Sequence, residues 1–433
     1  MGAMSQDHPT PAPAAHETQD ARWRIAGHAG LIELDRPKAL NSLNADMLAV
    51  ISEALDEFEA NPQVHHVVLR STSPRAFCAG GDVRWVAGED AQGKHEVGDE
   101  FFRVEYALNR RLGEYPEPLI ALLEGVTMGG GFGISAHGSH RVITPRSLGA
   151  MPEAAIGFIP DVGMSYRLTH LRLREEGGSS GEADGAGADG TGADGADVGG
   201  ADLGGGDVGG AGAVPRKSIA VGTFIGLTGW RLSPADLLYT GLATNLVADV
   251  DAVAHALETR EVSEVLAPDS QWSLGADELD QPRSALRDNA AFIEEVFAYG
   301  DWLEMSRRLR DYEPAGERHA GAGAGAGEGH AGAGEGHAGD NGTAEFVEQV
   351  RAAVAKGNPV SLAATVELFH ASALVDLPTA LDYEAVLARY LRRQPNFTEG
   401  VRAVLVDKDH AAAFDPSTAE GVDIAELRAL LMS

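Results

Sequence analysis

Strand-like and helix-like spacings of apolar residues alternate along the first third of the chain. Residues 22–26 and 31–34 have strand length and flank a glycine-containing turn, which predicts a β-hairpin. Apolar side chains next recur at helical spacing at four positions, namely Met47, Ile51, Leu55 and Phe58. Acidic side chains fill the opposite side of this segment, so we expect an amphipathic helix that packs on a core.

Two apolar strands each lead into a loop that contains glycine. The β-branched run at 64–69 precedes a loop with Gly81, and the apolar run at 119–123 precedes a loop with Gly130. A strand that turns through glycine into a helix leaves unpaired backbone N–H groups, and these donors suit an oxygen that gains negative charge. Each loop alone is best explained as a tight connection. Two such loops favour an oxyanion hole, which needs two convergent donors. The order strand, glycine loop, helix occurs twice, and this repeat predicts an α/β fold of ββα units.

Two acids stand in the apolar segment that follows the second glycine loop. Glu153 lies in Met-Pro-Glu and Asp161 in Ile-Pro-Asp. Apolar neighbours disfavour the ionised form of a carboxyl group, so we interpret Glu153 as a catalytic base rather than a solvated surface residue. Asp161 has two compatible interpretations, as the second acid of a pair or as the N-cap of a helix at 162–171. An oxyanion site followed by two carboxylates is suited to acyl chemistry.

Two low-complexity segments interrupt a mostly helical second half. The segments at 174–214 and 315–342 are dominated by glycine and alanine, and they cannot bury enough apolar surface to offset the entropy of ordering. Both are therefore predicted to be disordered, and histidines on such a flexible chain favour a linker over a metal site. Apolar spacing elsewhere predicts helices at 216–228, 234–240, 284–298, 301–310, 344–355, 360–373 and 378–393. The chain is accordingly divided into a disordered tail at 1–20, an α/β core at 21–173, an insertion at 174–214, a helical part at 215–314, a linker at 315–342 and a continued helical part at 343–433.

Composition excludes several classes of protein. The 433 residues carry a formal charge of −31, which argues against nucleic-acid binding and requires local arginines for any anionic ligand. Cys78 is the single cysteine, so no internal disulfide can form and a reducing compartment suits the chain. The first 20 residues contain no apolar signal core, and the longest apolar run is a poor membrane span. These observations predict a soluble, cytoplasmic protein.

Taken together, the motifs resemble the crotonase (enoyl-CoA hydratase/isomerase) superfamily. The resemblance rests on the stretches at 77–84, 128–131 and 151–153. Two further stretches, at 152–163 and 397–409, are similar to the 3-hydroxyisobutyryl-CoA hydrolase branch. The match covers nearly the whole chain apart from the tail and the low-complexity segments. It implies an α/β crotonase (ClpP/crotonase-like) spiral of ββα units with a helical C-terminal part.

The resemblance also implies roles for individual residues. The backbone amides of Gly81 and Gly130 are expected to form the hole for a thioester oxygen. Glu105, on a helix predicted at 99–113, is expected to line the acyl pocket together with Glu153 and Asp161. Coenzyme A is then part of the substrate, and neither a separate cofactor nor a metal ion is implied.

One departure from the family pattern narrows the expected activity. The hydratase branch carries a catalytic glutamate on the helix after the glycine triplet, and the corresponding position here is Gly133. The hydratase branch usually has glycine where this chain has Asp161. The resemblance therefore implies hydrolysis of the thioester of 3-hydroxyisobutyryl-CoA, or of a close 3-hydroxyacyl-CoA, as in valine catabolism. Glu153 would be the base or the nucleophile, and Asp82 would hold the first glycine loop.

Two other functions stay open at this point. The first is an enoyl-CoA hydratase or isomerase on the same fold, and the second is a non-catalytic scaffold that binds acyl-CoA. A serine nucleophile is disfavoured, because His137 follows Ser135 where the Gly-x-Ser-x-Gly elbow needs glycine. The expected partner is a small acyl-CoA, with no nucleic acid and no membrane. Crotonase relatives often form trimers or hexamers, which leaves a homo-oligomer open.

Overall fold

The computed structural model describes three stretches of the chain, residues 15–174, 216–314 and 338–432. Most of each segment predicted to be disordered, at 1–20, 174–214 and 315–342, lies outside these described residues. Regular structure extends further than the sequence suggested at two boundaries. Strand β1 (Ala15–Glu17) occupies part of the predicted tail, and helix α13 (Ala338–Val354) begins inside the predicted linker.

Seven strands form the main sheet, in the spatial order β1-β2-β3-β4-β6-β8-β10. After β1, their bounds are β2 (Ala21–Ala26), β3 (Ala29–Leu34), β4 (His66–Ser71), β6 (Leu119–Leu123), β8 (His140–Ile143) and β10 (Asn245–Leu246). The first three strands are antiparallel, which confirms the predicted hairpin, and the pairs from β3 to β10 are parallel. Strand β6 is buried along its whole length, as its continuous apolar run requires.

Three shorter strands form a second sheet, in the order β5-β7-β9. Their bounds are β5 (Ala76–Cys78), β7 (Val126–Met128) and β9 (Leu148–Ala150). Both pairs are parallel, so the carboxyl ends of all three strands lie at the same edge. This small sheet therefore gathers the two glycine loops and the Met-Pro-Glu segment, which are far apart in the sequence.

Helices pack around the two sheets in the first part of the chain. Their bounds are η1 (Pro37–Ala39), α1 (Ala45–Ala60), α2 (Val83–Asp90), α3 (His95–Gly113), α4 (Gly130–Gly133), η2 (Glu153–Ile156) and α5 (Met164–Thr169). Helix α1 begins where the Asn44 side chain accepts a hydrogen bond from the Met47 amide, and the apolar residues at its predicted helical spacing are buried. The helix predicted at 99–113 is confirmed as α3, which starts one turn earlier.

The second half of the chain is helical, as predicted. Its elements are α6 (Arg216–Thr228), α7 (Pro234–Tyr239), α8 (Val250–Leu257), α9 (Val262–Val265), η3 (Ala276–Glu278), α10 (Ala285–Asp288), α11 (Ala290–Phe297), α12 (Trp302–Asp311), α13, α14 (Pro359–Ser372), α15 (Leu377–Arg392), α16 (Pro395–Val401), the π-helix η4 (Arg402–Val406), η5 (Ala419–Gly421) and α17 (Ile424–Leu431). The helix predicted at 284–298 is interrupted at Asn289, which ends α10 and begins α11. Helix α7 starts with a capping box between Ser233 and Asp236.

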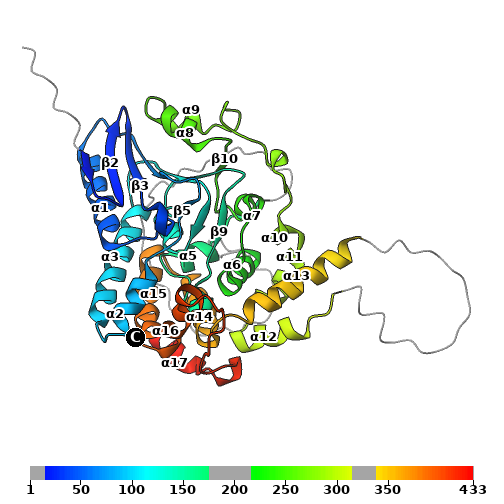
Figure 1. Ribbon diagram of the computed structural model, residues 1–433. Coiled ribbons are helices and arrows are strands. Elements are labelled where there is room, and N and C mark those ends of the chain that lie inside the picture. The colour runs from blue at the N-terminus through cyan, green and yellow to red at the C-terminus, as the bar shows by residue number, and fades with distance from the viewer. Residues whose placement is uncertain (1–14, 175–215, 315–337, 433) are drawn as a thin grey trace, which may run out of the picture.

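The two halves share one hydrophobic core. Helices α14 and α15 pack against α5 and α3 below the sheets in the view of Figure 1. At this junction the ring of Phe158 lies 5.4 Å from that of Phe102 and 5.5 Å from that of Phe397, measured between centroids. The C-terminal helices therefore form a wall beside the small sheet and are not a separate domain.

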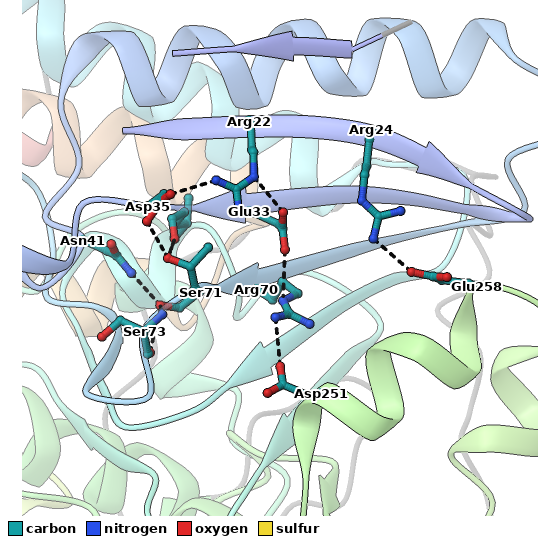
Figure 2. A network of polar contacts seen from close by, with 12 residues as sticks. Arg22, Arg24, Glu33, Asp35, Asn41, Arg70, Ser71, Ser73, Asp251 and Glu258 are labelled. Carbon is teal, nitrogen blue, oxygen red and sulfur yellow. Dashed lines mark hydrogen bonds and ion pairs between the residues drawn. The ribbon is translucent and has the colours of Figure 1, made fainter. Parts of the chain in front are cut away.

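A polar network ties the outer strands to the rest of the molecule (Figure 2). Arg24 pairs with Glu258 at 2.9 Å, and Arg70 pairs with Asp251 at 2.8 Å. Such exposed pairs contribute only about 0–1 kcal/mol each. Asn41 is fully buried, and its amide donates to the Ser71 hydroxyl at 2.7 Å and to the backbone of β5. This side chain thereby fixes the strand that leads into the first glycine loop.

Candidate functional site

The carboxyl ends of the small sheet carry three of the residues that the sequence pattern singled out. Strand β5 leads to Gly81, β7 leads to Gly130, and β9 leads to Glu153. Because the strands are parallel neighbours, these three residues leave the sheet side by side. The edge formed by parallel strand ends is also where open α/β sheets place their ligand sites.

The amides of Gly81 and Gly130 converge. A Cβ on Gly130 would lie 3.0 Å from the Gly81 nitrogen, so the two backbones nearly touch. The preceding residues, Gly80 and Gly129, have φ angles of +102° and +47°, which glycine adopts with little strain. Within the described part of the chain, neither the Gly81 nor the Gly130 amide donates a hydrogen bond. Both donors are therefore available to a carbonyl oxygen, as the resemblance implied.

Asp82 holds the first of these loops, as predicted. Its carboxylate accepts a hydrogen bond from the Trp85 amide at 3.3 Å and so caps the start of α2. The same carboxylate pairs with Arg36 at 2.9 Å. These two contacts occupy Asp82 in fixing the loop beside Gly81.

Glu105 reaches the two amides from α3. Its side chain is 1% exposed, and its Oε1 has no hydrogen-bond partner among the described residues. This oxygen would lie 2.5 Å from a Cβ on Gly130 and 3.8 Å from a Cβ on Gly81, so any larger residue at 130 would collide with it. Burial raises the pKa of Glu105 well above its ordinary value, and the charge of Asp161 raises it further. Both effects favour the neutral acid.

Glu153 is the first residue of η2 and is also buried. Its Oε1 would lie 2.7 Å from a Cβ on Gly129, and its Oε2 has no partner in the part of the chain that the structure describes. Burial raises the pKa of Glu153 well above its ordinary value, and the charge of Asp161 adds to this effect. A carboxylate with a raised pKa is a stronger base than an exposed one.

Asp161 lies in the loop before α5 and faces α3. The Tyr106 hydroxyl donates a hydrogen bond of 2.6 Å to its carboxylate. Burial raises the pKa of Asp161 to about 7, although the Tyr106 hydrogen bond opposes this shift. The interpretation of Asp161 as a helix N-cap is wrong, because α5 begins only at Met164, after Gly163, and the Asp161 side chain points to Tyr106 instead.

The structure thus brings together all five residues proposed from the sequence. Gly81 and Gly130 supply backbone donors, while Glu105, Glu153 and Asp161 supply carboxyl groups from three different elements. The Asp161 charge raises the pKa of both glutamates, which places the three acids within electrostatic range of one another. Such groups release their protons as a coupled unit rather than one by one.

A fourth buried carboxyl group, which the sequence did not suggest, stands behind Asp161. Glu384 of α15 is fully buried and accepts hydrogen bonds from the Gly163 amide at 2.7 Å and the Ser165 amide at 3.0 Å. Burial and the charge of Asp161 raise its pKa to about 8. Glu384, rather than Asp161, is therefore the residue that caps α5. In the sequence it is one of two acids, with Asp382, in an amphipathic helix, so no local signal marks it.

Gly133 lies in a crowded part of the site. A Cβ at this position would lie 2.7 Å from the Val162 Cβ and 3.0 Å from the Asn109 side-chain nitrogen. Val162 has a φ of +58°, which is rare for a β-branched residue and marks local strain. Asn109 follows Glu105 by one helical turn, is fully buried, and has no partner for either amide atom among the described residues. The chain therefore lacks both a carboxylate at position 133 and the space for one.

Ser135 and His137 do not form a nucleophilic pair. The Ser135 hydroxyl is buried and donates to the Gly131 carbonyl at 2.7 Å. Burial lowers the pKa of His137 to about 4, and its ring contacts the Val162 carbonyl at 2.7 Å. The neutral imidazole therefore supports the Val162 turn, and the sequence argument against a serine nucleophile agrees with the structure.

A pocket of about 320 Å³ opens between α3 and α15, and Tyr106 lines it. The pocket contains arginines, but Arg110 pairs with Asp382 at 2.8 Å and Arg392 pairs with Asp90 at 2.6 Å. Arg103 also lines the pocket and pairs with Glu100 at 2.6 Å, and Arg389 is the fourth arginine of the lining. Among the described residues there is no group of three or more potential metal ligands, and no described helix is long and apolar enough to cross a membrane.

Comparisons with known sequences assign most of the chain to one family model. The model is described as enoyl-CoA hydratase/isomerase and matches residues 29–181 and 205–431. The 3-hydroxyisobutyryl-CoA hydrolase, mitochondrial, of Danio rerio is 30% identical over 402 residues, which cover 92% of this chain and 85% of that protein. The protein of the same name from Homo sapiens is 29% identical, with 93% and 85% covered.

Two solved structures share the fold over nearly their whole length. An enoyl-CoA hydratase from Rhodobacter sphaeroides 2.4.1 has a TM-score of 0.70 and 28% identity, covering 95% of this chain and 97% of that one. A carnitinyl-CoA dehydratase from Mycobacterium thermoresistibile has a TM-score of 0.71 and 25% identity, covering 96% of each chain. The C-terminal helices are therefore part of the shared architecture.

Proposed function

This chain belongs to the enoyl-CoA hydratase/isomerase family, and we propose that it hydrolyses the thioester of 3-hydroxyisobutyryl-CoA or of a close 3-hydroxyacyl-CoA. The observation that carries the proposal is the pair of unpaired amides, Gly81 and Gly130, which face buried carboxyl groups with unpartnered oxygens. The names of the full-length relatives give the acyl group. The products are the free hydroxy acid and coenzyme A.

The two amides act on the carbonyl oxygen of the thioester. Negative charge develops on this oxygen when a nucleophile adds to the carbonyl carbon, and donors that are already in place stabilise it without reorganisation. Gly81 and Gly130 lie at the ends of two paired strands, so their relative position is set by the sheet. Loss of one such donor typically costs about 10²–10³ in rate.

Glu153 supplies the base or the nucleophile. As a base, its carboxylate takes a proton from water while the water oxygen bonds to the carbonyl carbon. The C–S bond then breaks, and the proton passes to the departing thiolate, so water and thioester give acid and thiol. As a nucleophile, the carboxylate adds to the carbonyl carbon and the C–S bond breaks, which leaves an anhydride and the thiolate of coenzyme A. Water then hydrolyses the anhydride to the free acid and the Glu153 carboxyl group, and the proton released passes to the thiolate. Burial, which strengthens the carboxylate as a base, supports either course.

Asp161 and Glu105 position the other reacting groups. Asp161 already accepts a hydrogen bond from Tyr106, which favours its anion, and this anion suits the 3-hydroxyl of the acyl chain. Glu105 is favoured as a neutral acid, which can donate as well as accept a hydrogen bond. Its unpartnered oxygen lies beside both amides, where it can orient the water or the substrate.

The alternative with specific support is hydration of an enoyl-CoA, because the two solved relatives are described as an enoyl-CoA hydratase and a carnitinyl-CoA dehydratase. Hydration in this family, by the resemblance drawn above, uses an acid at the position of Gly133. Val162 and Asn109 fill the space that such a side chain would need. This crowding supports hydrolysis over hydration.

Release of free thiol from a panel of acyl-CoA thioesters tests the proposal. A hydrolase releases thiol from 3-hydroxyisobutyryl-CoA, which a thiol reagent detects, and leaves the enoyl absorbance of crotonyl-CoA unchanged. Loss of that absorbance without thiol release would replace the proposal with a hydratase. Neither signal, together with binding of acyl-CoA, would indicate a non-catalytic scaffold.

The setting of the reaction is a further part of the proposal. A place in valine catabolism follows from the names of the relatives. The same panel of thioesters tests it, because 3-hydroxyisobutyryl-CoA should then be preferred over longer 3-hydroxyacyl-CoA thioesters.

The relatives are named as mitochondrial, whereas a cytoplasmic location stays our prediction for this chain. Assembly into a homo-oligomer is also a prediction, and sedimentation of the purified protein tests it.

A further inference from the structure

The buried glutamate on α15 makes an unusually complete set of contacts with the turn that follows Asp161. One oxygen of Glu384 accepts from the Gly163 amide at 2.7 Å. The other accepts from the Ser165 amide at 3.0 Å and from the Ser165 hydroxyl at 2.5 Å. The Ser372 hydroxyl of α14 in turn donates to the Ser165 hydroxyl at 2.9 Å. Two helices from the C-terminal part therefore hold one short turn.

This turn is the part of the site that most needs support. Val162 lies between Asp161 and Gly163 and has a left-handed φ of +58°, a conformation that costs about 1–3 kcal/mol. Such a conformation persists only where the surroundings hold it. The contacts from Glu384 begin at Gly163, directly after Val162, and the His137 ring contacts the Val162 carbonyl. Without these contacts the turn can relax, and the direction of the Asp161 side chain would change with it.

We propose that Glu384 is a positioning residue for Asp161: by holding the amides of Gly163 and Ser165 it fixes the turn at Val162, and thereby aims the Asp161 carboxylate at Tyr106 and at the reacting groups. The assignment rests on the proposed hydrolase activity. It makes the C-terminal helices part of the site, since Glu384 reaches from α15 to a loop that lies 221 residues earlier.

Electrostatics gives independent support for the link. The charge of Asp161 is one of the causes that raise the pKa of Glu384, so the two carboxyl groups interact across the turn. Tyr106, whose hydroxyl bonds to Asp161, has its pKa raised by charge on both Asp161 and Glu384.

A double-mutant cycle separates positioning from a general contribution to stability. Glu384→Gln keeps the shape of the side chain but turns a donor toward the turn amides. We expect kcat for thiol release to fall about 10- to 100-fold, because small misplacements of reacting groups have effects of this size, while KM stays within twofold. In the Asp161→Asn background the same change should have less than a twofold effect on the residual rate, because Glu384 acts through Asp161.

Glu367→Gln is the matched control. Glu367 is also a buried glutamate of the C-terminal helices, but it pairs with Arg428 at 2.7 Å, away from the turn. Its substitution should leave kcat unchanged even where the melting temperature falls. An unchanged kcat in Glu384→Gln, or effects of Glu384→Gln and Asp161→Asn that simply multiply, would overturn the assignment. If Glu384→Gln does not fold, Ser165→Ala can replace it in the double-mutant cycle with Asp161→Asn, because it removes the hydroxyl donor to Glu384.

Hydrogen exchange gives a readout that does not depend on activity. Amides at 161–165 should exchange faster in Glu384→Gln than in wild type or Glu367→Gln. Equal exchange in all three proteins would overturn the positioning role. An inactive wild-type enzyme with this exchange pattern would refute the proposed function while leaving the structural link between Glu384 and the Asp161 turn supported.

Discussion

Removal of the Tyr106 hydroxyl should move the pH dependence of the reaction without abolishing it. The hydroxyl donates a hydrogen bond of 2.6 Å to the Asp161 carboxylate, which is 4% exposed. A hydrogen bond to an ionised group contributes about 1.5–3 kcal/mol. Since about 1.4 kcal/mol corresponds to one unit of pKa, Tyr106→Phe should raise the apparent pKa of the acid cluster by about one to two units.

The sign follows from which form the hydrogen bond stabilises. The bond favours the anion of Asp161 and holds its pKa down to about 7 against the effect of burial. Without the hydroxyl, the acid limb of kcat/KM should move to about pH 8–9. The rate at pH 7 should then fall about 5- to 50-fold, because the wild-type carboxyl is already half protonated there, and recover toward the wild-type rate near pH 9.5.

The assay is thiol release between pH 5.5 and 9.5, with Tyr115→Phe as the control. The Tyr115 hydroxyl bonds to the Leu55 carbonyl at 3.4 Å in the α/β core, so its removal should leave the profile in place. A Tyr106→Phe profile that superimposes on wild type would show that Asp161 does not control the acid limb. A rate that falls equally at every pH would show that Tyr106 acts by packing alone.

Three further predictions address the other buried groups. Glu153→Gln should lower kcat by about 10²–10⁴ with KM mostly kept, and a variant that retains more than about a tenth of wild-type kcat would refute the catalytic role. The native pKa values of Asp161 and Glu384, about 7 and about 8, exceed their ordinary values of 3.8 and 4.5. The native state therefore holds protons that the unfolded chain releases, so the melting temperature should fall as pH rises from about 5 to 8, and a flat or rising curve would contradict these directions. Asn109→Leu should raise the free energy of unfolding by about 1–3 kcal/mol, measured in urea, because it removes two buried polar atoms without partners. A loss of stability would mean that a bound water satisfies this amide.

Some residues of the site could be predicted because their immediate neighbours in the sequence mark them. The glycine loops were expected directly after the strands at 64–69 and 119–123, and the short strands β5 and β7 that lead into Gly81 and Gly130 were not predicted. The pairing of β5 with β7 is what places the two loops together. Glu153 was recognisable because its neighbours are apolar, which is also why it is buried in the structure. For Glu105 the helix alone was uninformative, and the family resemblance identified it.

The remaining residues depend on contacts between distant segments. Glu384 faces a turn 221 residues earlier, and in a helix of mixed charge its burial has no local signature. Tyr106 looks like an ordinary apolar residue of α3 until the fold brings Asp161 to its hydroxyl. The same contacts explain the wrong N-cap, which was inferred because aspartate is a preferred residue at helix starts. Here Glu384 takes the α5 amides, and Asp161 bonds to Tyr106 instead.

The oxyanion donors and the acids come from different elements of the fold, which explains how one scaffold can serve more than one reaction. The two oxyanion donors are backbone amides at the ends of β5 and β7, so side-chain substitutions change them little. The acids come one at a time from α3, from η2 and from the loop before α5, and each can be exchanged without disturbing the sheet. Gly133 and Asp161 are the two positions at which the resemblance implies a departure from the hydratase pattern. Val162 joins them, because its side chain packs on Gly133 and its backbone follows Asp161. The turn that presents Asp161 therefore also occupies the space that a carboxylate at position 133 would need.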